Sequence, residues 1–441
     1  MDAATKASRI RDALPAGGLF DGHEWRIATK PFPLETKFVR ELESLGRVLL
    51  KFYRATDLLY RQSLTGKQPA WVAEWLDQGK PQSILEWQRQ AGFKSALPRV
   101  LRPDILLTEG GWHITELDSV PGGIGLTGWL NESYGKHFEV IGGTHGMVSG
   151  FAGMFSGDGP VKIIVSEESA TYRPEMEWLC EQAGERFTVH DTEFDQFATG
   201  DSVYRFFELF DLDNVPNHRT LFELATTKQI QLTPPPKTNL EEKMIFGLFW
   251  NRNLREFWQR ELGGKFFNQL QNVIPQTWIM DPTPLPPHAA MPGLDLTDWQ
   301  QLSALSKKDR ELVLKLSGYN ERAWGARSVR LGHDLSQSEW ADAVTKAITG
   351  FEQSPWILQR FKKPRSVQHE WYDFESGEVK SMYGRVRLCP YYFVHAEETI
   401  TLGGILATVC PADKKIIHGM RDAILAPCGV GEVNEASPGN L

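Results

Sequence analysis

Apolar residues recur at three- and four-residue spacing from Pro33 to Leu64, and this spacing places them on one face of a long helix. Gly66 and Pro69 end that pattern. A tryptophan-rich helical stretch from Trp71 to Gln90 follows, with an expected interruption at Gly79–Pro81. Residues 1–100 are therefore predicted to form an N-terminal helical region that covers a sheet.

From residue 101 onward, short apolar and β-branched runs predict strands. The first two are joined across Glu109–Gly111, which is a hairpin signal. The elements expected over residues 101–236 are strands at Asp104–Leu107, Trp112–Leu117, Val161–Val165, Phe187–His190 and Ser202–Leu209, and a helix at Pro174–Ala183. The strand–helix–strand order from residue 161 favours a parallel sheet, so this region is predicted to be an α/β domain that carries the hairpin.

Pro234–Pro236 is the clearest linker, because three prolines cannot continue a helix or a central strand. Beyond it a helix is expected to begin near Leu240. Further elements are expected as strands at Leu312–Leu316, Trp356–Phe361, Val379–Leu388 and Thr399–Val409 and a helix at Gln337–Gly350. This pattern predicts a third region over residues 237–430 and a flexible tail at 431–441.

Composition excludes several classes of protein. The 441 residues carry 48 Lys and Arg against 56 Asp and Glu, a formal charge of −8, which argues against a nucleic-acid partner. No apolar stretch approaches the ~20 residues that a membrane span requires, and Met1–Leu14 lacks the apolar core of a signal peptide. The four cysteines show no CxxC spacing. A cytoplasmic protein with no membrane partner is expected, and the sequence indicates no oligomeric state.

The first predicted hairpin carries three acidic residues. Glu116 and Asp118 are two apart on one strand, so their side chains point to the same face. A three-residue loop places Asp104 opposite Glu116 on the neighbouring strand. Three carboxylates on one face repel each other, and a hard divalent cation such as Mg²⁺ relieves that repulsion. An acidic, solvent-facing hairpin without a metal is the alternative interpretation.

Basic residues in the third region give a second signal. Lys315 lies inside an apolar strand, and a glycine-bearing loop follows it. Such a lysine can act as a point charge for phosphate, or it can belong to an edge strand with an ordinary turn. The strand Trp356–Phe361 could frame a flat base. Arg385 and Arg387 share one face of the next strand pair, where they could bind phosphate or pair with acidic residues.

In order and spacing, these segments resemble the ATP-grasp ligases, and in particular the synthetase domain of the glutathionylspermidine synthase family. The first motif of the resemblance is Arg102-Pro103-Asp104, with Glu116 twelve residues after the aspartate and an acidic residue two further on. The second is Lys243, which opens a helix that ends in tryptophan seven residues later. The resemblance extends from about Leu101 to Pro427.

The resemblance implies an ATP-grasp fold of the α+β class, with a preceding α/β domain and the N-terminal helical layer. It implies an ATP- and Mg²⁺-dependent enzyme that joins a small-molecule carboxylate to an amine through an acyl phosphate. It also implies site roles: Mg²⁺ on Asp104, Glu116 and Asp118, phosphate contacts from Lys243, Lys315 and Arg387, adenine beside Gln359 and Phe361, and Arg102 facing the acyl centre.

Three departures from the family pattern are visible. Asp118 stands where the family has asparagine, the loop after Lys315 is longer than the family's compact glycine turn, and an amidase domain is missing from this sequence. The glutathione and spermidine pockets therefore do not carry over. Two other interpretations stay open: an ATP-binding sensor or partner subunit without ligase activity, and a carbohydrate or peptide enzyme with Glu116 and Asp118 as acid and base.

Overall fold

The computed structural model describes residues 2–21, 24–323, 325–414, 417 and 419–432. The chain divides into two compact units, each made of segments that are far apart in the sequence. Unit 1 comprises Met1–Leu50, Arg89–Pro236 and Pro364–Leu441, and unit 2 comprises Lys51–Gln88 and Lys237–Lys363. Most of the flexible tail expected at 431–441 lies outside the described residues.

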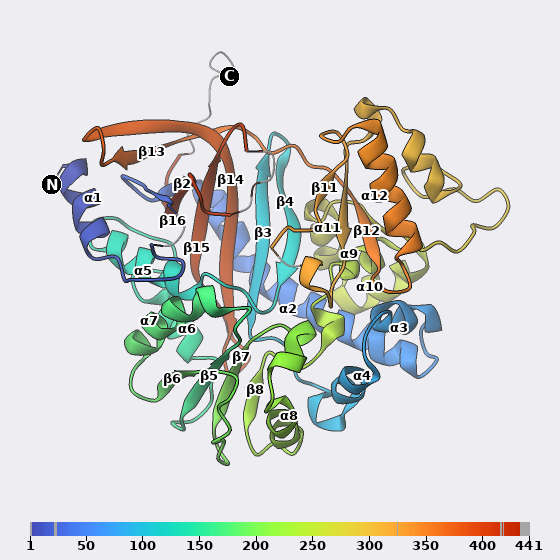
Figure 1. The fold of residues 1–441 in the computed structure, drawn as a ribbon, viewed down its shortest axis with the longest axis horizontal. Coiled ribbons are helices and arrows are strands. Elements are labelled where there is room, and N and C mark those ends of the chain that lie inside the picture. The colour runs from blue at the N-terminus through green and yellow to red at the C-terminus, as the bar shows by residue number, and fades with distance from the viewer. Residues whose placement is uncertain (1, 22–23, 324, 415–416, 418, 433–441) are drawn as a thin grey trace. The chain divides into compact units, whose positions relative to one another are not determined.

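Unit 1 is built on an eight-stranded, mostly antiparallel sheet. The long strand β14 pairs with β15 on one side and with β3 and β13 on the other, and the hairpin partner β4 lies at the sheet edge beyond β3 (Figure 1). The strands are β1 (Arg26–Ile27), β2 (Phe32–Leu34), β3 (Val100–Thr108), β4 (Gly111–Asp118), β13 (Val367–Asp373), β14 (Glu378–Val394), β15 (Ile400–Pro411) and β16 (Ile424–Val430).

The first part of helix α2 (Thr36–Leu64) packs on this sheet within unit 1. The Tyr392 hydroxyl on β14 donates to the Leu42 carbonyl at 2.7 Å and is buried. Gly46 allows this approach, since a Cβ there would lie 2.7 Å from the Tyr392 ring. The expected apolar stripe is buried at Leu42, Leu45 and Leu49, and further along the helix Phe52 stacks on Trp258 in unit 2.

A second, four-stranded sheet in unit 1 is parallel, in the order β6-β5-β7-β8. Its central strands are largely buried, as parallel strands covered on both faces are. β5 is buried except at Lys162, and β7 is buried throughout although it contains Ser202 and Arg205. Its strands are β5 (Val161–Val165), β6 (Phe187–His190), β7 (Ser202–Phe206) and β8 (Gln231–Thr233). The remaining helical segments of unit 1 are α1 (Ala3–Asp12), η1 (Ala91–Phe93), α5 (Ile124–Gly135), α6 (Gly146–Ala152), η2 (Ala170–Tyr172), α7 (Arg173–Ala183), η3 (Leu209–Asn214) and α8 (His218–Thr226).

Unit 2 has a four-stranded antiparallel sheet in the order β11-β10-β12-β9. One face of this sheet packs with α12 and η6 in a core that includes Trp340, Leu314 and Leu358. The strands are β9 (Thr277–Ile279), β10 (Leu312–Leu316), β11 (Arg330–Leu331) and β12 (Trp356–Arg360). The helical segments are α3 (Ala70–Asp77), α4 (Gln82–Arg89, its last residue in unit 1), η4 (Thr238–Leu240), α9 (Met244–Trp250), η5 (Arg252–Leu254), α10 (Arg255–Leu262), α11 (Gly264–Val273), η6 (Trp299–Ala304), η7 (Lys307–Asp309), η8 (Glu321–Ala323) and α12 (Gln337–Thr349).

Several expected elements are confirmed. The long helix, the break between α3 and α4, the hairpin, the parallel strands β5 to β7 and the strands β10 and β12 occur where the sequence pattern places them. The mixture of helices with parallel and antiparallel sheets is that of an α+β protein.

The expected division of the chain differs from the compact units. Residues 1–100 are not purely helical, because the short strands β1 and β2 each pair with β16. Residues 364–430 were expected with the nucleotide-binding region, but β14 is hydrogen-bonded to β3, which places this segment in unit 1. The hairpin likewise belongs to the antiparallel sheet, not to the parallel one.

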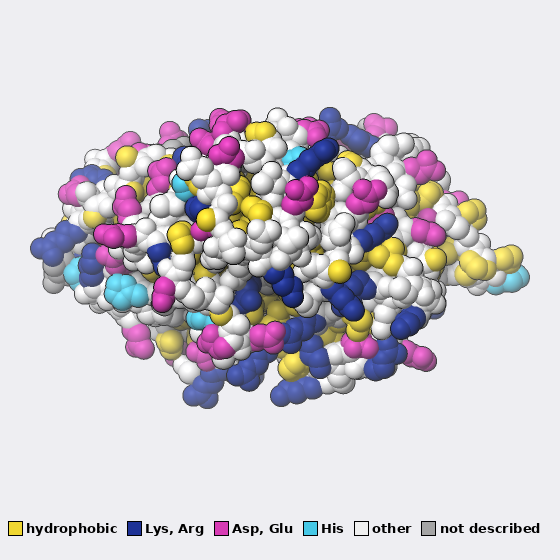
Figure 2. Space-filling view, turned by 90° about the horizontal axis from the view of Figure 1, so that it is seen from below, with side chains coloured by type: hydrophobic (Ala, Val, Ile, Leu, Met, Phe, Trp, Pro, Cys, Tyr) yellow, Lys and Arg dark blue, Asp and Glu magenta, His cyan; other side chains and the backbone are white. Residues whose placement is uncertain are grey.

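Charged side chains of both signs are mixed over the face shown in Figure 2, and Lys and Arg gather towards its lower part. The formal charge of −8 is therefore not a uniformly negative surface on this face. Within the described part of the chain, none of the helices combines the length and the apolar composition that crossing a bilayer demands.

Candidate functional site

The β3–β4 hairpin in unit 1 brings the expected arginine and carboxylates together. In the strand register Arg102 lies opposite Asp118, and Asp104 lies opposite Glu116 as expected. The three-residue loop behind that expectation is not observed, because Thr108 pairs with Gly111 and a register shift between Asp104 and Ile105 restores the alignment. β14 adds Arg387 next to this pair of strands, since Arg387 is the register partner of Leu106 on β3. We call these five residues the arginine–carboxylate cluster.

Ion pairs link four members of the cluster. The Arg102 guanidinium lies 3.3 Å from Oδ1 of Asp104 and 3.0 Å from Oδ2 of Asp118. Nη1 of Arg387 lies 3.3 Å from the second oxygen of Asp104. The buried Cys389 thiol also donates to Asp104, and burial together with this carboxylate raises the Cys389 pKa to about 12, so the thiol keeps its proton. Asp104 is thus a buried carboxylate with a guanidinium at each oxygen.

The three carboxylates do not fit a metal ion in this arrangement. Their hard oxygens are of the kind that Mg²⁺ prefers, but the part of the chain that the structure describes contains no group of three or more His, Cys, Asp or Glu side chains arranged to hold a metal. The physical reason is that Asp104 and Asp118 turn towards the arginines. The Mg²⁺ site at Asp104, Glu116 and Asp118 therefore stays a prediction, and no step below passes through it.

A glycine turn next to the cluster is held from three sides. The carbonyl of Gly122 accepts from Arg102 at 3.3 Å and from the Tyr391 hydroxyl at 2.8 Å. The Glu175 carboxylate on α7 accepts from the N–H of Gly123 at 2.6 Å and of Leu126 at 2.9 Å, which satisfies donors at the start of α5. The Gly-rich segment is a packed turn that helps fix the Arg102 side chain.

Burial raises the pKa of the Glu175 carboxyl to about 7, although the N–H groups of Leu126 and Gly123 act against this rise. Between pH 4.5, its ordinary pKa, and about pH 7, the unfolded chain releases this proton while the folded chain keeps it. The free energy of unfolding therefore falls as the pH rises through this window, by roughly 3 kcal/mol for this group at about 1.4 kcal/mol for each unit of pKa.

We expect Glu175→Gln to remove this pH dependence. The variant should gain stability relative to the wild type between pH 4.5 and 7, and urea unfolding across that range measures the difference. Asp373→Asn serves as a flat comparison, because hydrogen bonds from Lys380 and Glu375 lower the Asp373 pKa to about 2, and the pH dependence of this carboxyl therefore lies below the range measured. If the free energies of unfolding of the wild type and Glu175→Gln differ by the same amount at pH 4.5 and at pH 7, the assignment is contradicted.

The other expected site residues lie in unit 2. Lys315 on β10 is buried, and its ammonium donates to Oε1 of Gln359 on β12 at 3.0 Å. The Gln359 amide in turn donates to the Thr277 hydroxyl on β9 at 3.1 Å. Phe361 lies just beyond β12, with its ring 4.4 Å from that of His333. The face of the unit 2 sheet that is opposite the core thus carries the buried ammonium of Lys315 and the amide of Gln359.

Lys243 and the loop after β10 are joined by a hydrogen-bond network. The Lys243 ammonium donates to the Ala323 carbonyl at 2.8 Å, and its backbone N–H donates to the Ser317 carbonyl at 3.2 Å. The adjacent Glu242 accepts from the Ser317 hydroxyl and forms a 2.6 Å ion pair with Lys80, both side chains being at most 3% exposed. Glu242 therefore ties the start of α9 to the loop that follows Lys315.

The structure thus sorts the expected residues into two groups. Arg102, Asp104, Glu116, Asp118 and Arg387 lie in unit 1, and Lys243, Lys315, Gln359 and Phe361 lie in unit 2. Arg387 was expected with the phosphate contacts, but its ion pair joins it to Asp104.

Sequence reasoning missed Glu175, Glu242 and Lys80. The position of Glu175 in the first turn of a predicted helix, after Arg173-Pro174, is an N-terminal signal that could have found it. No local pattern identifies the partner of Lys80, since Glu242 lies far along the chain.

Comparisons with known proteins give a fold and no family. No protein-family model and no curated protein matches the sequence. The solved structure of a glutathione synthetase-like effector from Globodera pallida, in its apo form, is 9% identical, has a TM-score of 0.50 and aligns over 98% of both chains. A candidate gamma-glutamylcysteine synthetase from Methylobacillus flagellatus is 11% identical with a TM-score of 0.39, over 78% of this chain and 83% of that one, too low a score to argue from. Over nearly its whole length, the chain thus shares the fold of this effector.

Proposed function

We propose that this protein is an ATP-dependent carboxylate–amine ligase of the ATP-grasp type that acts on a small peptide, amino-acid or amine substrate. The observation that carries the proposal is the arginine–carboxylate cluster, in which Arg102 is fixed between Asp104 and Asp118 on paired strands. The glutathione synthetase-like fold and the basic residues of unit 2 support it.

The proposed reaction has two steps. A substrate carboxylate oxygen attacks the γ-phosphorus of ATP, ADP leaves, and an acyl phosphate forms. An amine then attacks the acyl carbon, loses a proton, and releases phosphate as the amide bond forms. Such transfers depend mainly on positioning and electrostatic stabilisation of developing charge.

Each residue group has a proposed role in this reaction. Arg102 stabilises the negative oxygen that develops at the acyl carbon, and Arg387 with Asp104 holds its position. Lys243 and Lys315 contact phosphate oxygens, for which they would exchange their present acceptors. Gln359 and Phe361 lie beside the adenine. ATP is proposed to bind as its Mg²⁺ complex. The three carboxylates are not given a role as ligands of this ion.

The second candidate is an ATP-binding sensor or partner subunit without ligase activity. The pairing of Asp104 and Asp118 with arginines, in place of a metal-binding group, favours it. Release of ADP in the presence of ATP and a panel of amino acids, dipeptides and polyamines separates the two. ADP release that requires both a carboxylate and an amine supports the ligase, and ATP binding without ADP release across the panel supports the sensor.

Lys315→Gln should abolish most of the stabilisation that ATP gives to the fold. The amide can still bond to Gln359, so the variant keeps a buried partner while it loses the charge that attracts phosphate. ATP at a hundred times its Kd raises the free energy of unfolding by about 2.7 kcal/mol, and thermal unfolding with and without ATP measures this gain. The exposed Lys346→Gln on α12 is the matched control. An unchanged ATP response in Lys315→Gln would remove Lys315 from the nucleotide site.

A further inference from the structure

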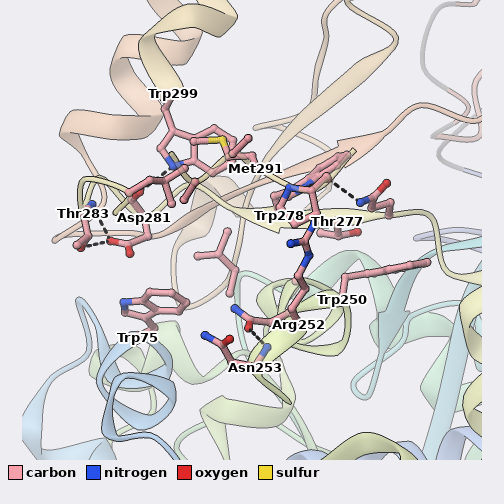
Figure 3. A pocket seen from close by; sticks show the side chains of 18 residues that line it. Trp75, Trp250, Arg252, Asn253, Thr277, Trp278, Asp281, Thr283, Met291 and Trp299 are labelled. Atoms are coloured by element: carbon pink, nitrogen blue, oxygen red, sulfur yellow. Dashed lines mark hydrogen bonds between the residues drawn. The ribbon is translucent and has the colours of Figure 1, made fainter. Parts of the chain in front are cut away.

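A pocket of about 370 Å³ lies within unit 2 at the edge strand β9 (Figure 3). This volume is in the range of small-molecule sites. Its walls come from α3, α9, η5, β9, η6 and the segment between β9 and η6. None of the unit 2 residues that are expected to contact ATP lines it.

Four indole side chains line the pocket: Trp75, Trp250, Trp278 and Trp299. Two of them are oriented by their own hydrogen bonds, since Trp278 donates to the Pro292 carbonyl at 2.9 Å and Trp299 donates to the Asp281 carbonyl at 2.7 Å. The Trp250 Nε1 is buried and has no hydrogen-bond partner in the described structure. The four indoles give the pocket a largely aromatic wall.

Charges of opposite sign also line the pocket. Arg252 on η5 is exposed, and the described residues give its guanidinium no ion pair or hydrogen bond. Asp281 uses one carboxylate oxygen to accept from the Thr283 N–H at 3.1 Å and hydroxyl at 2.8 Å, which holds the side chain in place. In the view of Figure 3, Arg252 rises towards Trp278, while the Asp281 carboxylate lies to the left, above Trp75.

We propose that this pocket binds a small zwitterion of the amino-acid class, a free amino acid or a dipeptide with an apolar side chain. Arg252 takes the carboxylate, Asp281 takes the ammonium group, and the apolar side chain lies against the indoles. Charge-assisted hydrogen bonds at both ends would fix the orientation of the ligand, and the aromatic surface would supply most of the buried area. The proposal goes beyond the ligase reaction and does not rest on it.

Isothermal titration calorimetry without ATP tests the assignment with three probes of similar shape. L-phenylalanine carries both charges, phenethylamine lacks the carboxylate, and 3-phenylpropionate lacks the ammonium group. We expect L-phenylalanine to bind the wild-type protein, and each single-charge probe to bind about tenfold more weakly, the effect of losing one charge-assisted contact.

Two variants test which residue binds the carboxylate of the ligand and which binds its ammonium group. Arg252→Gln should weaken L-phenylalanine and 3-phenylpropionate about tenfold and leave phenethylamine unchanged. Asp281→Asn should weaken L-phenylalanine and phenethylamine and leave 3-phenylpropionate unchanged. Arg255→Gln and Asp342→Asn are matched charge controls, because neither residue lines the pocket. The thermal midpoint of each variant shows that the fold is intact.

Three outcomes would overturn the proposal. The first is no binding of L-phenylalanine at millimolar concentration, and the second is equal binding of all three probes. The third is displacement of L-phenylalanine by ATP with loss of ATP binding in Trp299→Phe, which would make the pocket a nucleotide site. The three-probe titrations contain no ATP, so their failure is independent of the ligase proposal, which ADP release tests.

Discussion

Arg102→Ala should lower ligase turnover by about a hundredfold or more, because a donor aimed at a developing oxyanion contributes about 3 kcal/mol to the transition state. The ATP-induced rise in thermal midpoint should remain, since the residues proposed to contact ATP lie in unit 2. Steady-state rates of ADP release give the turnover, and thermal unfolding with and without ATP gives the shift in midpoint. Both are measured on the same preparation.

Removal of Arg102 also leaves Asp104 and Asp118 with one guanidinium fewer, which affects the fold as well as the reaction. Arg102→Lys separates the two effects, because it keeps the charge but loses the forked geometry that contacts both carboxylates and the Gly122 carbonyl. Arg99→Gln just before β3 is the matched control, as the described hydrogen bonds of Arg99 go to the carbonyls of Val394 and His395. Equal losses of ATP response and turnover in Arg102→Ala would contradict the oxyanion role.

Lys80→Met should lower the free energy of unfolding by about 3–5 kcal/mol, because it leaves the buried Glu242 carboxylate without its ion-pair partner. The double variant Lys80→Met/Glu242→Gln should recover most of that loss, since neither charge is then buried alone. Urea unfolding of the wild type and the two variants measures how much the Lys80–Glu242 ion pair contributes to the free energy of unfolding. Lys346→Met, at an exposed position, is the control for a lysine-to-methionine change.

The same pair positions the proposed nucleotide site. The Glu242 carboxylate accepts from Ser317, and Gly318 lies so close that a Cβ there would be 2.7 Å from the carboxyl carbon of Glu242. Glu242→Gln alone leaves the Lys80 ammonium buried without its partner, so it should lower the free energy of unfolding and also weaken the ATP response. A Lys80→Met variant no less stable than Lys346→Met would show that the buried charge pair does not support unit 2.

Elements with a strong local signal were predictable from the sequence. The stripe of α2 and the buried run of β5 follow from short-range periodicity and composition, and both occur as expected. The Asp104–Glu116 pairing occurs as expected but for a different reason. The turn is one residue shorter than expected, and a register shift between Asp104 and Ile105 makes up the difference.

Features that depend on distant partners were not predictable. The two-residue β1 carries too few residues for an alternating pattern, and it is a strand because β16 offers it backbone partners. The same holds for β14, whose place next to β3 depends on a pairing across nearly the whole chain. In the site, spacing predicted the carboxylates but not their pairing with Arg387, which comes from that distant strand.

Thermal unfolding of the wild-type protein with ATP alone, Mg²⁺ alone, and both together tests the central proposal most directly. A ligand that binds only the folded state raises the midpoint by an amount that grows with its concentration relative to Kd. The account predicts a clear rise with ATP and Mg²⁺ together and none with Mg²⁺ alone, because the three carboxylates do not form a metal-binding group. No rise at millimolar ATP and Mg²⁺ would contradict both the ligase and the sensor.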